Sequence, residues 1–150
     1  MPRVALLCCL VLPVTPIGCA TLEVPEGYIK LKDPGVYDFK AVSARGSAIA
    51  LSSRANEDRS AGLEFWVAAV EHQKVDVDGM KLVAREDIRS RSGLDGVLFH
   101  FEIGEGQARL AYLVALYVTP GRIFTIEGAG QADALAADMD KLRRSMQSLH

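Results

Sequence analysis

The stretch of sequence that decides the fold covers residues 97–127 and reads VLFHFEIGEGQARLAYLVALYVTPGRIFTIE. In its first part, Val97, Phe99 and Phe101 alternate with other residues, the period-two pattern of a strand with one face more deeply buried than the other. The run 110–118 has no charged residue on either face, which predicts a strand in the middle of a sheet that is covered on both sides. Three successive strands therefore form the predicted centre of the fold.

Short turns separate these strands. Residues 104–106 (Gly-Glu-Gly) are expected to turn the first strand into the second. In residues 119–122, proline presets φ at the second turn position and glycine tolerates positive φ at the third, so a third strand is expected over residues 122–127. Gly128 and Gly130 are then expected to release the chain into a terminal helix.

Two amphipathic patterns predict helices. Leu63, Trp66, Val67 and Val70 fall at i, i+3, i+4 and i+7 within residues 61–74, which places them on one face of a helix. The terminal helix carries a second apolar stripe with alternating four- and three-residue spacing: Leu135, Met139, Leu142, Met146 and Leu149. Each stripe is expected to pack on the sheet.

The rest of the domain is predicted to form strands and loops. Three short strands are expected over residues 28–31, 37–43 and 48–51, which are bounded by turn residues. The polar residues 52–60 predict a mobile loop or the frayed entry to the first helix. The loosely alternating residues 82–91 carry several charges, which is typical of an edge or near-edge strand because charged side chains oppose edge-to-edge aggregation.

The order β-β-β-α-β-β-β-β-α predicts the α+β fold class, with a single antiparallel β-sheet and amphipathic helices packed on it in a three-layer α/β/α sandwich. A chain of 150 residues with 49% hydrophobic and 24% charged residues fits one compact domain, expected over residues 28–150. The net charge of −2 gives no basic footprint, so nucleic acid is not expected as a partner.

The N-terminal residues have the pattern of an export signal. Arg3 precedes an apolar run over residues 4–14, which is too short to span a bilayer because that requires about 20 apolar residues. Ile17-Gly18-Cys19-Ala20 resembles the bacterial lipobox, in which the cysteine thiol receives a diacylglycerol and becomes the first residue of the mature protein. Pro16 stands where lipoboxes usually carry leucine. The alternatives are an ordinary cleaved secretion signal and a buried N-terminal segment.

The positions of the cysteines agree with a lipoprotein signal. Cys8, Cys9 and Cys19 all lie within the first nineteen residues, so no disulfide framework is expected in the domain. We expect a lipoprotein-type signal peptide over residues 1–18, lipidation of Cys19, and a tether over residues 19–27. A lipid anchor would hold the protein at a membrane of the bacterial cell envelope, with the domain on the periplasmic or extracytoplasmic side.

Nearly the whole mature chain resembles the PsbP-like family. The resemblance lies in the opening Val24-Pro25-Glu26-Gly27-Tyr28, the helix with Trp66, the three-strand meander, and the last helix after Ile126-Glu127-Gly128. It implies a three-layer α/β/α sandwich. Bacterial members are often small lipoproteins, and others are accessory proteins of photosynthetic membrane complexes or small GTPase-binding factors. The resemblance thus implies an accessory module with a protein partner, and it carries no shared active site onto these residues.

One pair of residues is a candidate for metal binding or acid–base catalysis. His100 and Glu102 lie two residues apart on one strand face, where an imidazole and a carboxylate could form a metal site or an acid–base site. A metal site needs three or four ligands, so an ion pair between this strand face and Arg109 or Arg122 is the more economical interpretation.

Three further patterns have structural interpretations. Gly128-Ala129-Gly130 resembles a phosphate-binding loop but lacks a third glycine and a following parallel strand, so we interpret it as a hinge at the entry to a helix. Arg85, Arg89 and Arg91 could form an anion-binding edge, but Asp87 interrupts them, so we interpret them as a solvated strand face. Trp66 is interpreted as a core residue.

The expected function follows from the leader and from the shortage of catalytic groups. No Gly-x-Ser-x-Gly elbow is present and no cysteine beyond the leader can act as a nucleophile, so no catalytic, cofactor-binding or metal-binding residue is assigned. We expect a bacterial envelope lipoprotein that acts as a non-catalytic binding or accessory module at a membrane. The alternative is a small periplasmic enzyme or metal-binding protein that uses His100 and Glu102.

Overall fold

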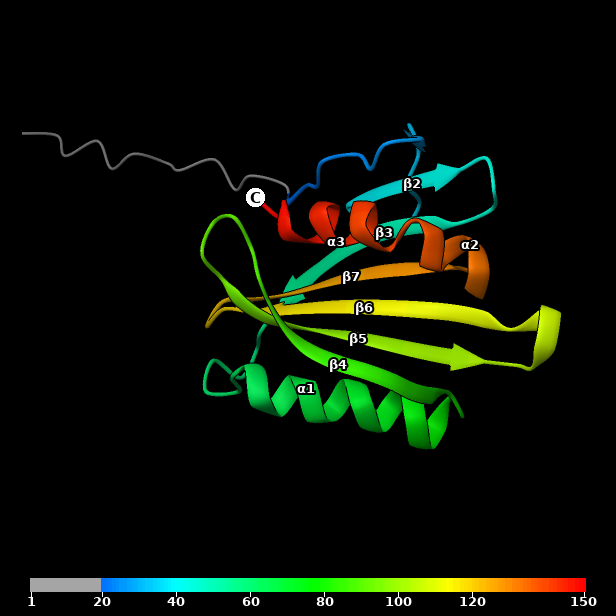
Figure 1. Ribbon diagram of the computed structural model, residues 1–150. Helices are drawn as coiled ribbons and strands as arrows, with labels where there is room; N and C mark the ends of the chain where they lie inside the picture. Colours follow the sequence, from blue (N-terminus) through cyan, green and yellow to red (C-terminus); the bar gives the residue numbers. More distant parts are fainter. Residues whose placement is uncertain (1–19) are drawn as a thin grey trace, which may run out of the picture.

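The computed structural model describes residues 20–150, drawn in colour in Figure 1. The signal peptide expected over residues 1–18 and the lipidation expected at Cys19 lie outside the described residues.

Seven strands form one antiparallel sheet in the order β1-β2-β3-β7-β6-β5-β4. The strands are β1 (Tyr28–Lys30), β2 (Phe39–Ser43), β3 (Ala48–Ala55), β4 (Lys81–Arg89), β5 (Asp95–Ile103), β6 (Leu110–Val118) and β7 (Arg122–Gln131). The helices are α1 (Leu63–His72), which continues into a π-helical turn (Gln73–Val77), a short 3-10 turn (Gly106–Ala108), α2 (Ala132–Ala137) and α3 (Met139–Gln147). The predicted α+β fold class and the predicted order of the strands are confirmed.

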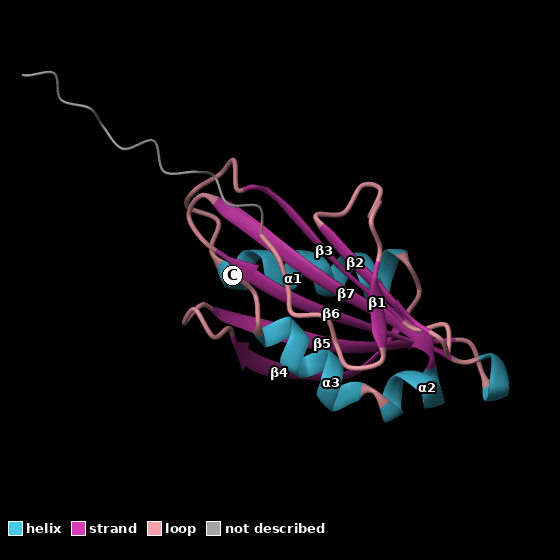
Figure 2. Ribbon diagram, turned by 90° about the horizontal axis from the view of Figure 1, so that it is seen from above, coloured by secondary structure: helices cyan, strands magenta, loops and turns pink. Residues whose placement is uncertain are grey.

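Helices cover both faces of the sheet. In Figure 1, α1 lies on one side of the strands, and α2 and α3 lie on the other side; in Figure 2, seen from above, α3 lies in front of the strands and α1 behind them. We call these the α1 face and the α3 face. On the α1 face, Val67 belongs to a buried cluster with Phe99 and Phe101. On the α3 face, Leu142 and Met146 are fully buried in a larger cluster.

The central position predicted for the run 110–118 is confirmed. This run is β6, which pairs with β5 on one side and with β7 on the other. Leu113 and Val114 point to opposite faces of the sheet, and each is only 1% exposed. The absence of charge along β6 therefore follows from its being covered on both faces.

Strand β3 is longer than predicted. Residues 52–55, expected in a loop or a frayed helix entry, continue β3 and pair with β7, with Ser52 opposite Thr125 and Ala55 opposite Arg122. The loop prediction is wrong for these residues because backbone ladder bonds to β7 extend the strand where its side chains are polar and partly exposed.

The glycines after Glu127 do not release the chain. Gly128 and Gly130 lie inside β7, which pairs with β6 as far as Gln131. A Cβ on Gly128 would meet Met146 Cε at 3.4 Å, and one on Gly130 would meet Ser47 Oγ at 2.7 Å. The hinge interpretation of residues 128–130 is therefore wrong, because these glycines let neighbouring residues approach the strand closely.

The terminal helix is divided in two at Asp138. This residue is 2% exposed, and its carboxylate accepts hydrogen bonds from the Tyr28 hydroxyl at 3.2 Å and from Arg45 NH2 at 2.5 Å. Despite the break, the predicted apolar stripe is preserved, with Leu135 and Leu142 fully buried.

Residues 20–27, expected as part of a tether, lie against the domain instead of extending from it. Leu22 is 4% exposed, the Thr21 N–H donates to the His150 carbonyl at 3.0 Å, and the Ser145 hydroxyl donates to the Glu23 carbonyl at 2.6 Å. The difference arises because burial of Leu22 and pairing with the C-terminal residues hold the segment in place. Within residues 20–150, none of the helices is both long enough and apolar enough to cross a membrane.

Candidate functional site

His100 and Glu102 lie on the α3 face of β5, as their alternation predicts. The distance from His100 Nε2 to Glu102 Oε1 is 3.8 Å, and both side chains are about four-fifths covered, at 23% and 21% exposed. His100 Nε2 is buried and has no hydrogen-bond partner among the described residues. The structure thus brings together the two residues that the sequence singles out.

Arg109 completes this polar cluster. Its Nε lies 3.8 Å from Glu102 Oε2, and its NH2 lies 3.7 Å from Asp133 Oδ1. The predicted ion pair with Arg109 is confirmed, whereas Arg122, the other arginine considered, lies at the opposite end of the strands beside Ala55. The separations in the cluster exceed hydrogen-bond distances, so these ion pairs are loose.

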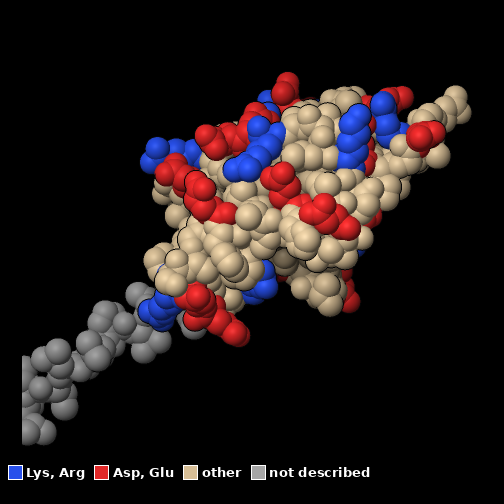
Figure 3. All heavy atoms as spheres, turned by 90° about the horizontal axis from the view of Figure 1, so that it is seen from below, with Lys and Arg blue, Asp and Glu red and all other residues tan. Residues whose placement is uncertain are grey.

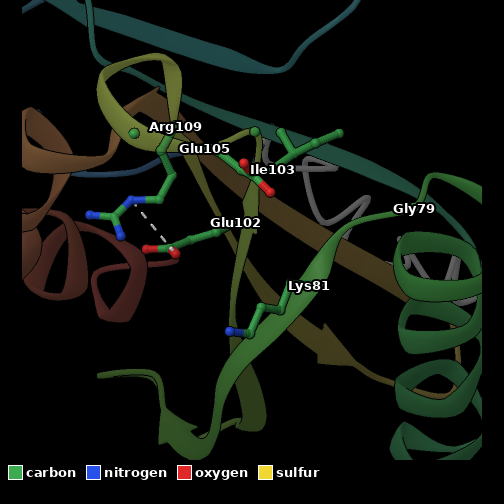
Figure 4. A pocket seen from close by; sticks show the side chains of 8 residues that line it. Gly79, Lys81, Glu102, Ile103, Glu105 and Arg109 are labelled. Atoms are coloured by element: carbon green, nitrogen blue, oxygen red, sulfur yellow. Dashed lines mark ion pairs between the residues drawn. The ribbon is translucent and has the colours of Figure 1, made fainter.

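The cluster borders a hollow of about 470 Å³ at the end of β5. Lys81 of β4 stands opposite Glu102 of β5, and Figure 4 shows Lys81, Glu102 and Arg109 pointing to the same side, with Arg109 and Glu102 facing each other. The lining residues are Gly79, Lys81, Glu102, Ile103, Gly104, Glu105, Gly106 and Arg109. Two cations and two carboxylates line this hollow, and the 3.8 Å separations around Glu102 are longer than the closely held acid and base that proton transfer needs.

Few side chains at this end of the strands could bind a metal ion. Across residues 20–150, no group of three or more His, Cys, Asp or Glu side chains is placed to hold a metal ion. Asp133 reaches the cluster only through Arg109, and its side chain is fully exposed. The arrangement is therefore a chain of charge pairs rather than a ring of ligands.

A second hollow, of about 420 Å³, lies at the opposite end of the same strands. It is lined by Ala20, Ser92, Leu94, Arg122, Phe124, Leu149 and His150. The sequence does not indicate this hollow, because its lining residues come from four segments that lie far apart in the chain. The sequence feature that could have indicated the hollow is Leu94, an apolar residue in an otherwise polar hairpin.

The arginines interpreted as a solvated strand face behave as such. Arg85 pairs with Glu71 at 3.3 Å, Arg89 pairs with Asp95 at 3.6 Å, and Arg91 pairs with Glu23. Figure 3 shows acidic and basic side chains interspersed on the face that carries α1. Charge of mixed sign on this face gives no anion-binding surface.

Trp66 packs at the edge of the α1-face cluster, which confirms its interpretation as a core residue. Its Nε1 donates to Asn56 Oδ1 at 3.3 Å, and the Arg54 guanidinium lies 4.5 Å from the ring centroid. Beneath the same helix, the Tyr112 hydroxyl donates to Glu127, and burial together with this carboxylate raises the pKa of Tyr112. The Trp66 N–H and the Tyr112 hydroxyl therefore both find hydrogen-bond partners within the domain.

Comparisons with known proteins bear on the fold. No protein-family model matches the sequence, and no curated protein matches it. The structure is similar to the solution structure of cyanobacterial PsbP (CyanoP) from Synechocystis sp. PCC 6803, with a TM-score of 0.59 and 13% identity over 93% of this chain and 98% of that one.

Two further structures share the architecture at lower similarity. A Bacteroides thetaiotaomicron VPI-5482 protein has a TM-score of 0.55 and 13% identity over 88% of this chain, but only 44% of its own. A Pseudomonas aeruginosa protein of unknown function, PA94, has a TM-score of 0.50 and 18% identity over 89% of this chain and 97% of its own. The resemblance seen in the sequence is thus matched in three dimensions, and the chain has a PsbP-like fold.

Proposed function

We propose that this protein is a bacterial envelope lipoprotein, anchored through a diacylglycerol on Cys19, which acts as a non-catalytic accessory module and holds a protein partner at the membrane. The observation that carries the proposal is the lipobox-like Ile17-Gly18-Cys19-Ala20 directly ahead of a PsbP-like domain. The family resemblance supports the accessory role, because bacterial members are often small lipoproteins and other members serve membrane complexes.

The packing of residues 20–27 supports direct anchoring. Ala20, the residue that follows Cys19, is 7% exposed and so packs against the domain. A lipid at Cys19 would hold the domain against the bilayer without a long spacer and would restrict its orientation. A single acyl chain binds a membrane only marginally, so a diacylglycerol is the smallest modification that would anchor the domain stably.

The polar cluster at His100 supports a non-catalytic role. Glu102 is shared between His100 and Arg109 at 3.8 Å from each, so its charge is partly balanced within the protein. A general base or a metal ligand set would require closer and more numerous partners. The partner would therefore be held by surface contacts rather than by a reaction centre.

The experiment is intact-mass analysis of the protein from a bacterial envelope fraction, with metabolic fatty-acid labelling. We expect a mature protein that starts at Cys19 and carries the diacylglycerol mass. Cys19→Ser should abolish labelling and membrane retention, whereas the matched control Cys9→Ser, in the leader, should keep both. An unlabelled, soluble species cut at a different residue would overturn the proposal and would assign the leader to ordinary secretion.

One observation favours the enzyme or metal-binding alternative that uses His100 and Glu102. His100 Nε2 is buried without a hydrogen-bond partner among residues 20–150, and buried polar atoms of this kind are uncommon in native proteins, where a catalytic or ion-binding role is one explanation for them. The alternative predicts that His100→Gln abolishes function while the domain remains folded.

A further inference from the structure

The hollow at the start of β5, which we call the apolar hollow, is built for an apolar ligand. Its lining residues include the apolar Leu94, Phe124 and Leu149, and its volume of about 420 Å³ falls within the range of roughly 300–1,000 Å³ that is typical of ligand pockets. Arg122 is the charged residue at its border. This chemistry suits a hydrocarbon chain with a polar end group.

Ala20 connects the apolar hollow to the site of proposed lipidation. Ala20 lines the hollow, and the next residue, Thr21, is fixed by hydrogen bonds in both directions with His150, at 3.0 and 3.3 Å. Consecutive Cα atoms are about 3.8 Å apart, so a group attached to Cys19 starts within a few ångströms of the hollow. A ligand tethered this closely has a high effective concentration at the site.

We propose that the apolar hollow holds part of one acyl chain of the lipid on Cys19. This inference rests on the proposed lipidation and adds an intramolecular lipid site to it. The first segment of the acyl chain would pack against Leu94 and Phe124, and the Arg122 guanidinium would donate to an ester carbonyl of the diacylglycerol. The remaining hydrocarbon would enter the bilayer, so the domain would be held with this end towards the membrane.

The position of the apolar hollow favours the lipid on Cys19 over other occupants. A flat apolar patch would suit the bilayer surface or a second copy of the chain, whereas this site is concave and its border includes the residue next to Cys19. The segments around it are also held in place, since the Arg91 N–H donates to the Gln147 carbonyl at 2.8 Å and the Leu94 N–H donates to Ser90 Oγ at 3.0 Å. The site is therefore formed before the lipid occupies it.

The test uses the full chain expressed in bacteria fed with a fatty acid that carries a diazirine and an alkyne. After illumination, mass spectrometry maps where the acyl chain has cross-linked. We expect cross-links on peptides that contain Leu94 or Phe124, and a several-fold lower yield of them in Phe124→Asp. Ile103→Asp, at an exposed apolar residue at the opposite end of β5, is the matched control and should leave the yield unchanged.

Each outcome has a defined meaning. Incorporation at Cys19 with cross-links only to phospholipid, or to a second copy or another protein, would overturn the inference and leave the proposed anchoring intact. Lack of any label at Cys19 would overturn both proposals. If circular dichroism shows that Phe124→Asp does not fold, Leu94→Ser in the β4–β5 hairpin takes its place, and an unchanged cross-linking yield in that variant would overturn the inference.

Discussion

The two ends of the α3 face are built in opposite ways. At the polar end, Glu102 lies 3.8 Å from both His100 and Arg109, and His100 Nε2 has no hydrogen-bond partner in the described part of the chain. At the apolar end, the side chain of Tyr117 is fully buried, and its hydroxyl donates to the Met146 carbonyl at 3.2 Å. The difference teaches that the end next to the N-terminal segment satisfies its buried polar groups with close hydrogen bonds, whereas the other end holds half-buried charged groups in longer ion pairs.

The largest effect is expected from a change to the core that both ends share. Leu142 is fully buried under α3 between the two ends, so Leu142→Asp would lose leucine packing and bury an unpaired carboxylate. These costs add up to several kcal/mol, which is comparable with the total stability of a domain. Circular dichroism should show an unfolded or strongly destabilised protein.

The control for this change is Ala136→Asp, which introduces the same residue on the exposed side of α2. It should melt close to the wild type. If Leu142→Asp also melted like the wild type, α3 would not belong to the core and the comparison between the two ends would lose its basis.

The next largest effect on stability is expected at the apolar end, and it depends on pH. Burial raises the pKa of Tyr117 from 10.0 to about 12. Because the folded state holds this proton more tightly, the stabilisation from Tyr117 is complete below pH 10 and is lost as the pH rises through about 12. Tyr117→Phe should cost about 1 kcal/mol at neutral pH by removing one hydrogen bond.

Urea unfolding between pH 7 and pH 12 measures this prediction. The stability of Tyr117→Phe should fall less steeply than that of the wild type above pH 10, so the two curves should converge. Tyr28 and Tyr112 also have raised pKa values and remain in both proteins, so the difference isolates Tyr117. Parallel curves would show that Tyr117 does not govern the alkaline stability of this end.

A smaller loss of folding stability is expected from a change at the polar end. Arg109→Ala removes two ion pairs of 3.7 and 3.8 Å from a partly exposed site, so the loss of stability should stay below about 1 kcal/mol and shrink in high salt. Thermal melts at low and high salt provide the measurement, with Arg85→Ala as a control that removes another exposed pair. A loss of several kcal/mol would mean that the polar end is a structural element after all.

The smallest effect is expected from His100→Gln. The substitution keeps a polar group of similar reach in a loosely packed cluster, so stability and function should both remain close to wild type. A complementation assay, together with measurement of protein level, tests this expectation. Complete loss of function at normal stability would instead favour the enzyme or metal-binding alternative at His100 and Glu102.

Much of the fold is predictable because its apolar patterns are long. The charge-free run of β6 and the stripe through Leu135 and Leu142 are regular enough to assign both the central strand and the helical cover. The pairing of Glu102 with Arg109 was also predictable, because the short connection over residues 104–109 brings the end of β5 next to the start of β6.

Other features depend on contacts that leave no local pattern. Gly128 reads as a breaker but serves as the place where Met146 approaches β7. Ser52 continues a strand because β7 supplies its ladder partner. The apolar hollow combines Ala20, Leu94, Phe124 and Leu149, which are too far apart in the sequence to form any periodicity. Such features are set by tertiary contacts and could not be predicted from the sequence alone.

The bridge between Thr21 and His150 bears on the timing of folding. It joins the first described residues to the last one, and Leu22 is buried in the same cluster as Leu149. Contacts between such distant positions form only after the C-terminal residues have left the ribosome, which delays the final closure of the domain. For a chain that is exported as we propose, late closure of this contact would favour a polypeptide that is still incompletely folded when export begins.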